Sequence, residues 1–223
     1  MLLLATDTSG KNGSLALAQC EGDQCTILEV VPLTGGTFSA QLVPQIAALL
    51  QKHGFAKHDI GGFAVASGPG SFTGLRVGLA AIKALAEVLQ KPIATVSLLE
   101  AIALSLHREG KIIAALDAGR NEAYLGEYTI ENSVANLHRE WLGTREQCFE
   151  TAMNMPLVTP DSGISGEAQR RSLQIEPVQY PQSDAIACIG WRKIQSGETI
   201  SPGDLDANYI RRSDAEIFST KTP

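Results

Sequence analysis

Aromatic residues are scarce in this 223-residue chain, at 5% of the sequence, and the formal net charge is −6. Proteins that hold nucleic acid unaided commonly stack bases on aromatic side chains and neutralise phosphates with clustered Lys and Arg. We therefore expect no strong binding to a nucleic acid by this chain alone.

Cysteine and histidine are also rare, with four of each. The cysteines show neither a CxxC pair nor the spacing of a zinc site or disulfide framework, so we expect reduced thiols in a cytoplasmic protein. The histidines fit neither HxxxH nor HExxH, so no metal site is predicted. Because no GxSxG elbow and no assignable base accompany a serine, no catalytic residue is predicted either. The cysteines are Cys20, Cys25, Cys148 and Cys188, and the histidines are His53, His58, His107 and His138.

Long apolar runs are missing as well. The N-terminal run from Leu2 is interrupted by Thr6 and Asp7, which excludes a membrane span there and indicates a buried strand. The composition, with 44% hydrophobic and 19% charged residues, is typical of a globular α/β protein with a sizeable core.

The pattern that is present occurs twice. In the first half, three strands at 2–6, 14–18 and 25–31 are followed by a helix at 39–53, a strand at 63–66, a helix at 72–90, a strand at 93–96 and a helix from Ser97. In the second half, an apolar strand again ends in Asp, at Asp117, and an alternating strand follows a small polar turn; a capped helix is predicted from Thr144. We predict a duplicated α/β fold with lobes at 1–109 and 110–223.

The stretch from Ser67 to Arg76 is predicted to turn from a strand into a helix. Gly68 and Gly70 allow unusual backbone angles, and Ser71 is placed to cap the helix. Free N–H groups at such a corner can hold an anion. A tight connection without a ligand explains the same residues, and the two interpretations stay open.

The helix that follows has two faces. An apolar stripe that begins at Leu75 is predicted to face the core, whereas Gly74, Gly78 and Ala81 line a side that another helix can approach closely. The second side predicts a helix contact, within the chain or across an interface.

The two strand-end carboxylates, Asp7 and Asp117, suit a metal ion and a nucleotide held between two lobes. The alternative, which we favour from the residues alone, is that each carboxylate caps its own turn.

Two of these motifs closely resemble the bacterial TsaB family: Asp7-Thr8-Ser9 after an apolar strand, and the run from Gly68 to Gly78. The similarity extends to Ser97–Ala101, to the turn at Asp117, and to Pro202 and Tyr209-Ile210-Arg211. It spans nearly the whole chain.

The resemblance implies a two-lobed actin-like (RNase H-like) fold. It also implies a non-catalytic role in making N6-threonylcarbamoyladenosine at adenosine 37 of tRNA, together with TsaD, the transferase, and TsaE, an ATPase. tRNA would be bound only through the complex, and the chain alone would form a homodimer. The implied partner interface comprises Ser39, Leu42, Ile46, Ser71, Phe72, Gly74, Leu75, Arg76, Gly78 and Ala81. The resemblance also implies that ATP or ADP can bind at the partner interface. The residues implied for binding a nucleotide or an anion are Asp7, Ser9, Gly68, Gly70, Ser71 and Asp117.

One departure concerns the start of the first helix, where family members commonly show His-Ser-Glu and this chain has Phe38-Ser39-Ala40. The competing hypothesis is a self-sufficient ATP-dependent phosphotransferase of the actin-like class that uses Asp7 and Asp117. A peptidase function is not predicted, because the sequence offers neither a nucleophile nor a base for it.

Overall fold

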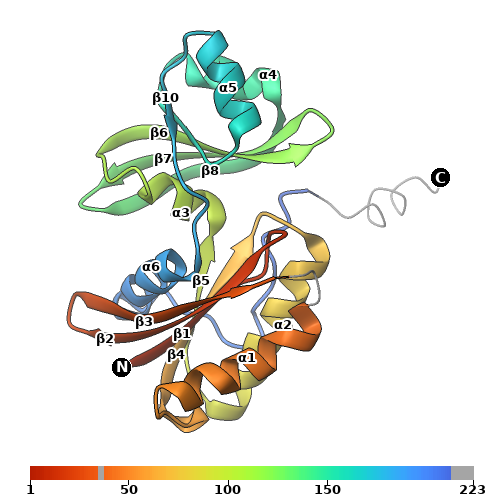
Figure 1. Cartoon of the computed structure of the whole chain (residues 1–223). Coiled ribbons are helices and arrows are strands. Elements are labelled where there is room, and N and C mark those ends of the chain that lie inside the picture. The colour runs from red at the N-terminus through yellow and green to blue at the C-terminus, as the bar shows by residue number, and fades with distance from the viewer. Residues whose placement is uncertain (35–37, 212–223) are drawn as a thin grey trace, which may run out of the picture. The chain divides into compact units, whose positions relative to one another are not determined.

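The computed structural model describes residues 1–34 and 38–211. They form two compact units, of which the first comprises Met1–Ala101 with Pro181–Ala207, and the second comprises Ile102–Tyr180 with the segment from Asn208 (Figure 1). Among these residues, no helix combines the length and the apolar character that crossing a membrane requires.

The first unit is built on a five-stranded sheet with the order β3-β2-β1-β4-β5. The pairs β1–β2 and β2–β3 are antiparallel, and β1–β4 and β4–β5 are parallel. The elements are β1 (Leu2–Asp7), β2 (Gly13–Glu21), β3 (Gln24–Leu33), α1 (Phe38–Lys52), η1 (Lys57–Asp59), β4 (Ile60–Gly68), α2 (Phe72–Leu89), β5 (Ile93–Ser97), α3 (Leu98–Leu104) and α6 (Ser183–Ser196).

The second unit repeats this connectivity. Its sheet has the order β10-β9-β6-β7-β8, with β6–β7 and β7–β8 antiparallel and β6–β9 and β9–β10 parallel. Its elements are β6 (Gly110–Gly119), β7 (Glu122–Glu131), β8 (Val134–Thr144), α4 (Arg145–Ala152), β9 (Leu157–Thr159), α5 (Ser162–Arg170) and β10 (Ile175–Pro177). Two sheets with matching strand order and direction confirm the predicted duplication and its actin-like fold class.

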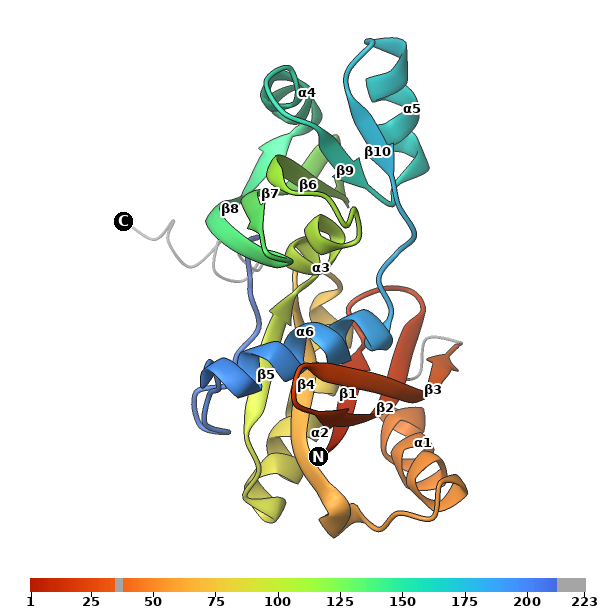
Figure 2. The same cartoon turned by 90° about the vertical axis from the view of Figure 1, so that its left-hand side faces the viewer.

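Helices cover both faces of the first sheet. α1 and α2 pack on one face and α6 lies across the other, against all five strands (Figures 1 and 2). Because β1 is central and covered on both sides, all six of its residues are buried, which explains its unbroken apolar run.

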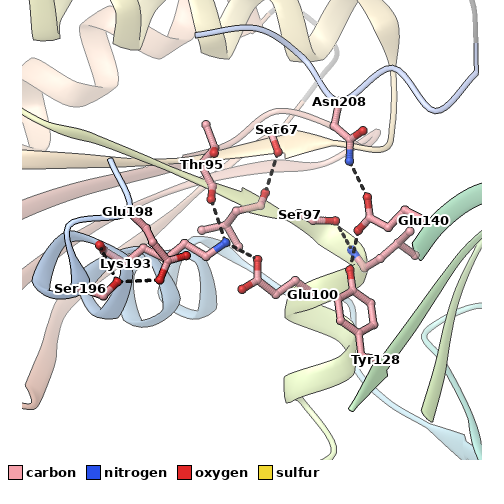
Figure 3. A network of polar contacts seen from close by, with 12 residues as sticks. Ser67, Thr95, Ser97, Glu100, Tyr128, Glu140, Lys193, Ser196, Glu198 and Asn208 are labelled. Carbon is pink, nitrogen blue, oxygen red and sulfur yellow. Dashed lines mark hydrogen bonds and ion pairs between the residues drawn. The ribbon is translucent and has the colours of Figure 1, made fainter. Parts of the chain in front are cut away.

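The position of α6 corrects the predicted division at residues 109 and 110. α6 follows the second unit's strands along the chain, yet it packs on the first sheet, where Gly190 lies so close to Ala64 that a Cβ on the glycine would come within 2.4 Å of the alanine Cβ. Lys193 of α6 also donates to the carboxylate of Glu100 (2.7 Å) and to the carbonyl of Thr95 (3.2 Å) (Figure 3). Sequence periodicity locates a helix but does not say which sheet it covers.

The segment after α6 returns to the second unit. Asn208 donates to the carboxylate of Glu140, which also accepts from the Tyr128 hydroxyl, at 2.6 and 2.5 Å respectively (Figure 3). Tyr209 and Ile210, which resemble a strand in sequence, lie outside any strand.

Candidate partner-binding site

The corner between β4 and α2 is bound to the turn that follows β1. Gly68 has a φ of 119°, which only glycine adopts easily, and the Ser71 hydroxyl accepts from the Gly74 N–H as the predicted helix cap. The Ser71 N–H donates to the carbonyl of Ser9 at 2.6 Å, and a Cβ on Gly70 would lie 2.5 Å from that same oxygen. The corner therefore turns Gly70 and the Ser71 N–H toward its own unit, as the interpretation of a tight connection expects.

The small-residue side of α2 is closed in the same way. A Cβ on Gly74 would lie 2.0 Å from the Thr8 carbonyl oxygen, and one on Gly78 would lie 2.3 Å from Thr8 Oγ1. The Thr8 hydroxyl also donates to the Gly74 carbonyl at 2.7 Å. The prediction that Gly74 and Gly78 face a partner is therefore wrong, because the turn after β1 fills the space that these glycines leave.

Asp7 is almost completely buried, with 2% of its surface exposed. Its Oδ1 accepts from the Ser9 N–H (2.8 Å) and the Ser9 hydroxyl (2.5 Å). Burial raises the pKa of the carboxyl above its ordinary value, and the two hydrogen bonds from Ser9 oppose that rise. Asp7 thus makes the bonds of a turn-capping residue.

Asp117 is exposed in the second unit. Its Oδ1 accepts from Arg145 at 2.9 Å and from the Gly119 N–H at 3.3 Å, while its own N–H donates to Asp161 at 2.7 Å. Each predicted carboxylate is engaged within its own unit, as the turn-capping interpretation expects. The nucleotide or anion site at Asp7, Ser9, Gly68, Gly70, Ser71 and Asp117 stays a prediction.

A surface groove of about 490 Å³ runs between α1 and α2. Its lining is mainly apolar and comprises Ser39, Leu42, Val43, Phe72, Thr73, Arg76, Val77, Ala80 and Ala81. Five of the residues predicted for the partner interface thus meet here: Ser39, Leu42, Phe72, Arg76 and Ala81. Ile46 and Leu75, also predicted for the interface, are buried in the core of the first unit.

Two large apolar side chains stand exposed at this groove. Phe72 is 39% exposed and Val43 is 55% exposed. The Arg76 guanidinium lies 3.7 Å from the centroid of the Phe72 ring, so a cation stacks on an aromatic face in the groove. Exposed apolar side chains that gather in one concave surface are typical of an interaction site.

Four residues of the groove were not predicted for the interface: Val43, Thr73, Val77 and Ala80. The outward row Phe72, Arg76 and Ala80, at four-residue intervals, was the available signal, because side chains four apart share one face of a helix. Phe72 and Arg76 of this row were predicted for the interface, and Ala80 lies in the same row.

The departure at the start of α1 also has a structural explanation. Phe38 is buried, and its ring packs so closely on Gly13 that a Cβ there would come within 3.0 Å of it. Ser39 and Ala40, which follow, are exposed. Phe38 thus contributes to the core of the first unit, and of the two positions that depart from the family pattern only Ala40 is exposed.

Comparison with known proteins gives one family description and several full-length relatives. The family described as TsaD, tRNA N6-adenosine threonylcarbamoyltransferase, matches residues 30–155, more than half of the chain. The tRNA threonylcarbamoyladenosine biosynthesis protein TsaB of Haemophilus influenzae is 34% identical over 100% of this chain and 98% of its own length. The chain belongs to the TsaB family.

Further relatives agree with this assignment. The TsaB protein of Escherichia coli is 32% identical over 96% of each chain. That of Bacillus subtilis is 35% identical, although the match covers only 60% of this chain and 58% of that protein. A Pseudomonas aeruginosa crystal structure described as an uncharacterized protein with similarity to peptidase YEAZ matches at TM-score 0.76 with 25% identity, over 94% of this chain and 99% of that one. This TsaB-family chain therefore shares its fold with a protein of solved structure over almost the full length of both chains.

Proposed function

We propose that this chain is the TsaB subunit needed to make N6-threonylcarbamoyladenosine on tRNA. The observation that carries the proposal is the similarity to TsaB proteins of H. influenzae and E. coli over nearly the whole of both chains. A match of this length includes both units, so it supports a role that the two units share.

The chain acts by binding, and its partner TsaD performs the transfer, with TsaE in the same assembly. Two features support the division of labour. The charge of −6 suits a subunit that reaches tRNA through others. Asp7 is buried at the end of β1, and its Oδ1 accepts hydrogen bonds from Ser9 of the same turn.

The α1–α2 groove is the proposed contact with TsaD. Its exposed Phe72 and Val43 give the kind of apolar anchor that dominates the binding energy of protein interfaces, and Arg76 adds a charged group beside them. In the absence of TsaD, a second copy of the chain covers the same groove and forms the homodimer.

Reconstitution tests the function. Purified chain, TsaD and TsaE from the same organism are incubated with unmodified tRNA and the threonylcarbamoyl donor, and the modified nucleoside is quantified by mass spectrometry after digestion. We expect modification with all three proteins and at most a trace without this chain. Equal modification in its absence would overturn the proposal.

Two variants of α2 then test the interface. Phe72→Ala removes the exposed ring in the groove and should weaken the affinity for TsaD by about tenfold or more, the usual effect of losing an aromatic anchor. Val88→Ala is the matched control, because Val88 is 74% exposed on the same helix but does not line the groove. Affinity is measured by calorimetry. Unchanged affinity in Phe72→Ala would show that the interface with TsaD lies outside the groove, and it would not contradict the proposed function.

A further inference from the structure

Three of the four cysteines meet at one place in the first unit. Cys20 and Cys25 face each other across the β2–β3 hairpin, and Cys188 comes from α6, 163 residues after Cys25. The sequence gives no sign of this cluster, because the spacing of the cysteines fits no disulfide or zinc pattern. Only the placement of α6 on the first sheet brings the third thiol to the other two.

The Cys20–Cys25 pair has the geometry in which cross-strand side chains lie closest. The Cys20 N–H donates to the Met1 carbonyl (2.8 Å), and the Cys20 carbonyl accepts from the Met1 amino group (2.5 Å). Both backbone groups of Cys20 therefore point away from β3, which makes Cys20 and Cys25 a non-hydrogen-bonded pair. Their sulfur atoms are 3.2 Å apart.

α6 is held over the same hairpin by two hydrogen bonds to one carbonyl. Trp191 Nε1 and Gln195 Nε2 both donate to the Gly22 oxygen in the hairpin turn, at 2.9 and 2.5 Å. Cys188, Trp191 and Gln195 lie three and four residues apart, so they share one face of the helix. The anchoring sets Cys188 beside Cys25. The Cys188 sulfur lies 3.9 Å from the Cys25 carbonyl oxygen, and the Cys25 thiol is hydrogen-bonded to the Cys188 side chain.

The three thiols differ in the pKa that their surroundings give them. The hydrogen bond from the Cys25 thiol lowers the pKa of Cys188 to about 7, although burial and Asp184 act against this and Arg192 assists it. The same hydrogen bond, with burial, raises the pKa of Cys25. Burial raises the pKa of Cys20, which is also inaccessible. Cys188 and Cys25 are half-buried, whereas Cys20 is buried. Since thiolate is the attacking form, the lowered pKa and the partial exposure favour Cys188 as the nucleophile, with the Cys25 thiol beside it.

We propose that Cys188 and Cys25 form a reversible disulfide, with Cys188 as the attacking thiol, Cys25 as the resolving thiol and a low-molecular-weight disulfide as the oxidant. The Cys188 thiolate attacks one sulfur of the oxidant, forming a mixed disulfide and releasing one thiolate. Cys25 then loses its proton, attacks the Cys188 sulfur and releases the second thiolate. The protein has lost two electrons, and the oxidant has become two reduced thiols.

The bond would tie helix α6 to strand β3 of the first sheet. It would close a loop between residues 163 positions apart, and cross-links that close long loops restrict the unfolded chain most. The oxidised protein should therefore have a higher melting temperature than the reduced protein. The inference concerns this unit alone and does not depend on the proposed role in tRNA modification.

The test uses the full chain incubated with oxidised glutathione, followed by alkylation of the remaining thiols and peptide mass spectrometry. Digestion with trypsin and a Glu-specific protease separates Cys20 from Cys25, because Glu21 lies between them. We expect a cross-linked peptide pair containing Cys25 and Cys188, a higher melting temperature, and reversal of both by dithiothreitol.

Three variants decide the assignment. Cys25→Ser should stop at the mixed disulfide and carry one glutathione on Cys188, whereas Cys188→Ser should neither cross-link nor gain glutathione at Cys25. Cys148→Ser is the matched control, because Cys148 is buried in the second unit and should leave the reaction unchanged. A predominant Cys20–Cys25 bond, or equal thiol loss in Cys188→Ser and the unaltered chain, would overturn the proposal.

Discussion

Asp7 is a residue whose ionisation lowers the free energy of unfolding. Its carboxyl group is buried at the end of β1, and burial raises its pKa above the ordinary value of 3.8. An acid whose pKa is higher in the folded state than in the unfolded state stabilises the fold fully below the unfolded value. That contribution is lost as the pH rises through the folded value. At neutral pH the buried carboxylate therefore opposes folding.

We predict that Asp7→Asn removes this pH dependence. The free energy of unfolding of the unaltered chain, minus that of the variant, should increase as the pH falls toward 3.8, by at most about 1.4 kcal/mol per pH unit. Urea titrations at several pH values measure the difference. Ser9→Ala should extend the window to higher pH, because the Ser9 hydroxyl stabilises the ionised form. A difference that does not change with pH would show that burial leaves the pKa of Asp7 unshifted.

Two helix caps follow directly from the local sequence. The caps at Ser71 and Thr144 were predicted, and each accepts from the backbone N–H three residues on. Both ends of each bond lie in one helical turn, so the sequence specifies them directly. The structural role of Phe38 depends on Gly13, far away in the chain, and the local pattern says nothing of it.

At the scale of elements, the docking of α2 depends on glycine. Gly78 packs on the Thr8 side chain. The surface of α2 that was predicted to face a partner therefore contacts the turn after β1 instead. A bulky residue at this position would lower affinity for a partner only by damaging the fold. It would be a poor test of the interface.

We predict that Gly78→Ala destabilises the chain by about 1 to 3 kcal/mol, as overpacking of a filled core does. The added Cβ would stand 2.3 Å from Thr8 Oγ1, so the penalty should be smaller in a Thr8→Ala background, where that atom is gone. Urea denaturation of both single variants and the double variant measures the coupling. Additive effects would mean that the helix shifts instead of colliding with Thr8.

At the scale of the whole molecule, the first unit is assembled from two distant segments. α6 covers the face of the first sheet opposite α1 and α2, and its buried residues include Ile186, Ala187 and Trp191 (Figure 2). Without α6, the fragment 1–109 would expose that apolar face to water.

We predict that the fragment 1–109 shows no cooperative thermal transition, because it cannot bury the second face of its sheet. A chain that joins residues 1–101 through a Gly-Ser linker to residues 181–207 should melt cooperatively. Circular dichroism on heating and the dispersion of amide NMR signals distinguish the two. Cooperative melting of the fragment 1–109 would restore the division that the sequence suggested.

The sequence by itself determined the repeated strand that ends in Asp, the approximate bounds of most strands and helices, the caps of two helices and the resemblance that led to the TsaB family, but it did not predict α5 and β10. These features depend on periodicity and on hydrogen bonds between near neighbours, which any stretch of chain carries with it. The tertiary structure decided what covers each face: Thr8 on Gly74 and Gly78, α6 on the first sheet, Cys188 beside Cys25, and the open groove at Phe72. These contacts join residues far apart in the chain, so only the packing of the folded molecule specifies which surfaces are filled and which remain for a partner.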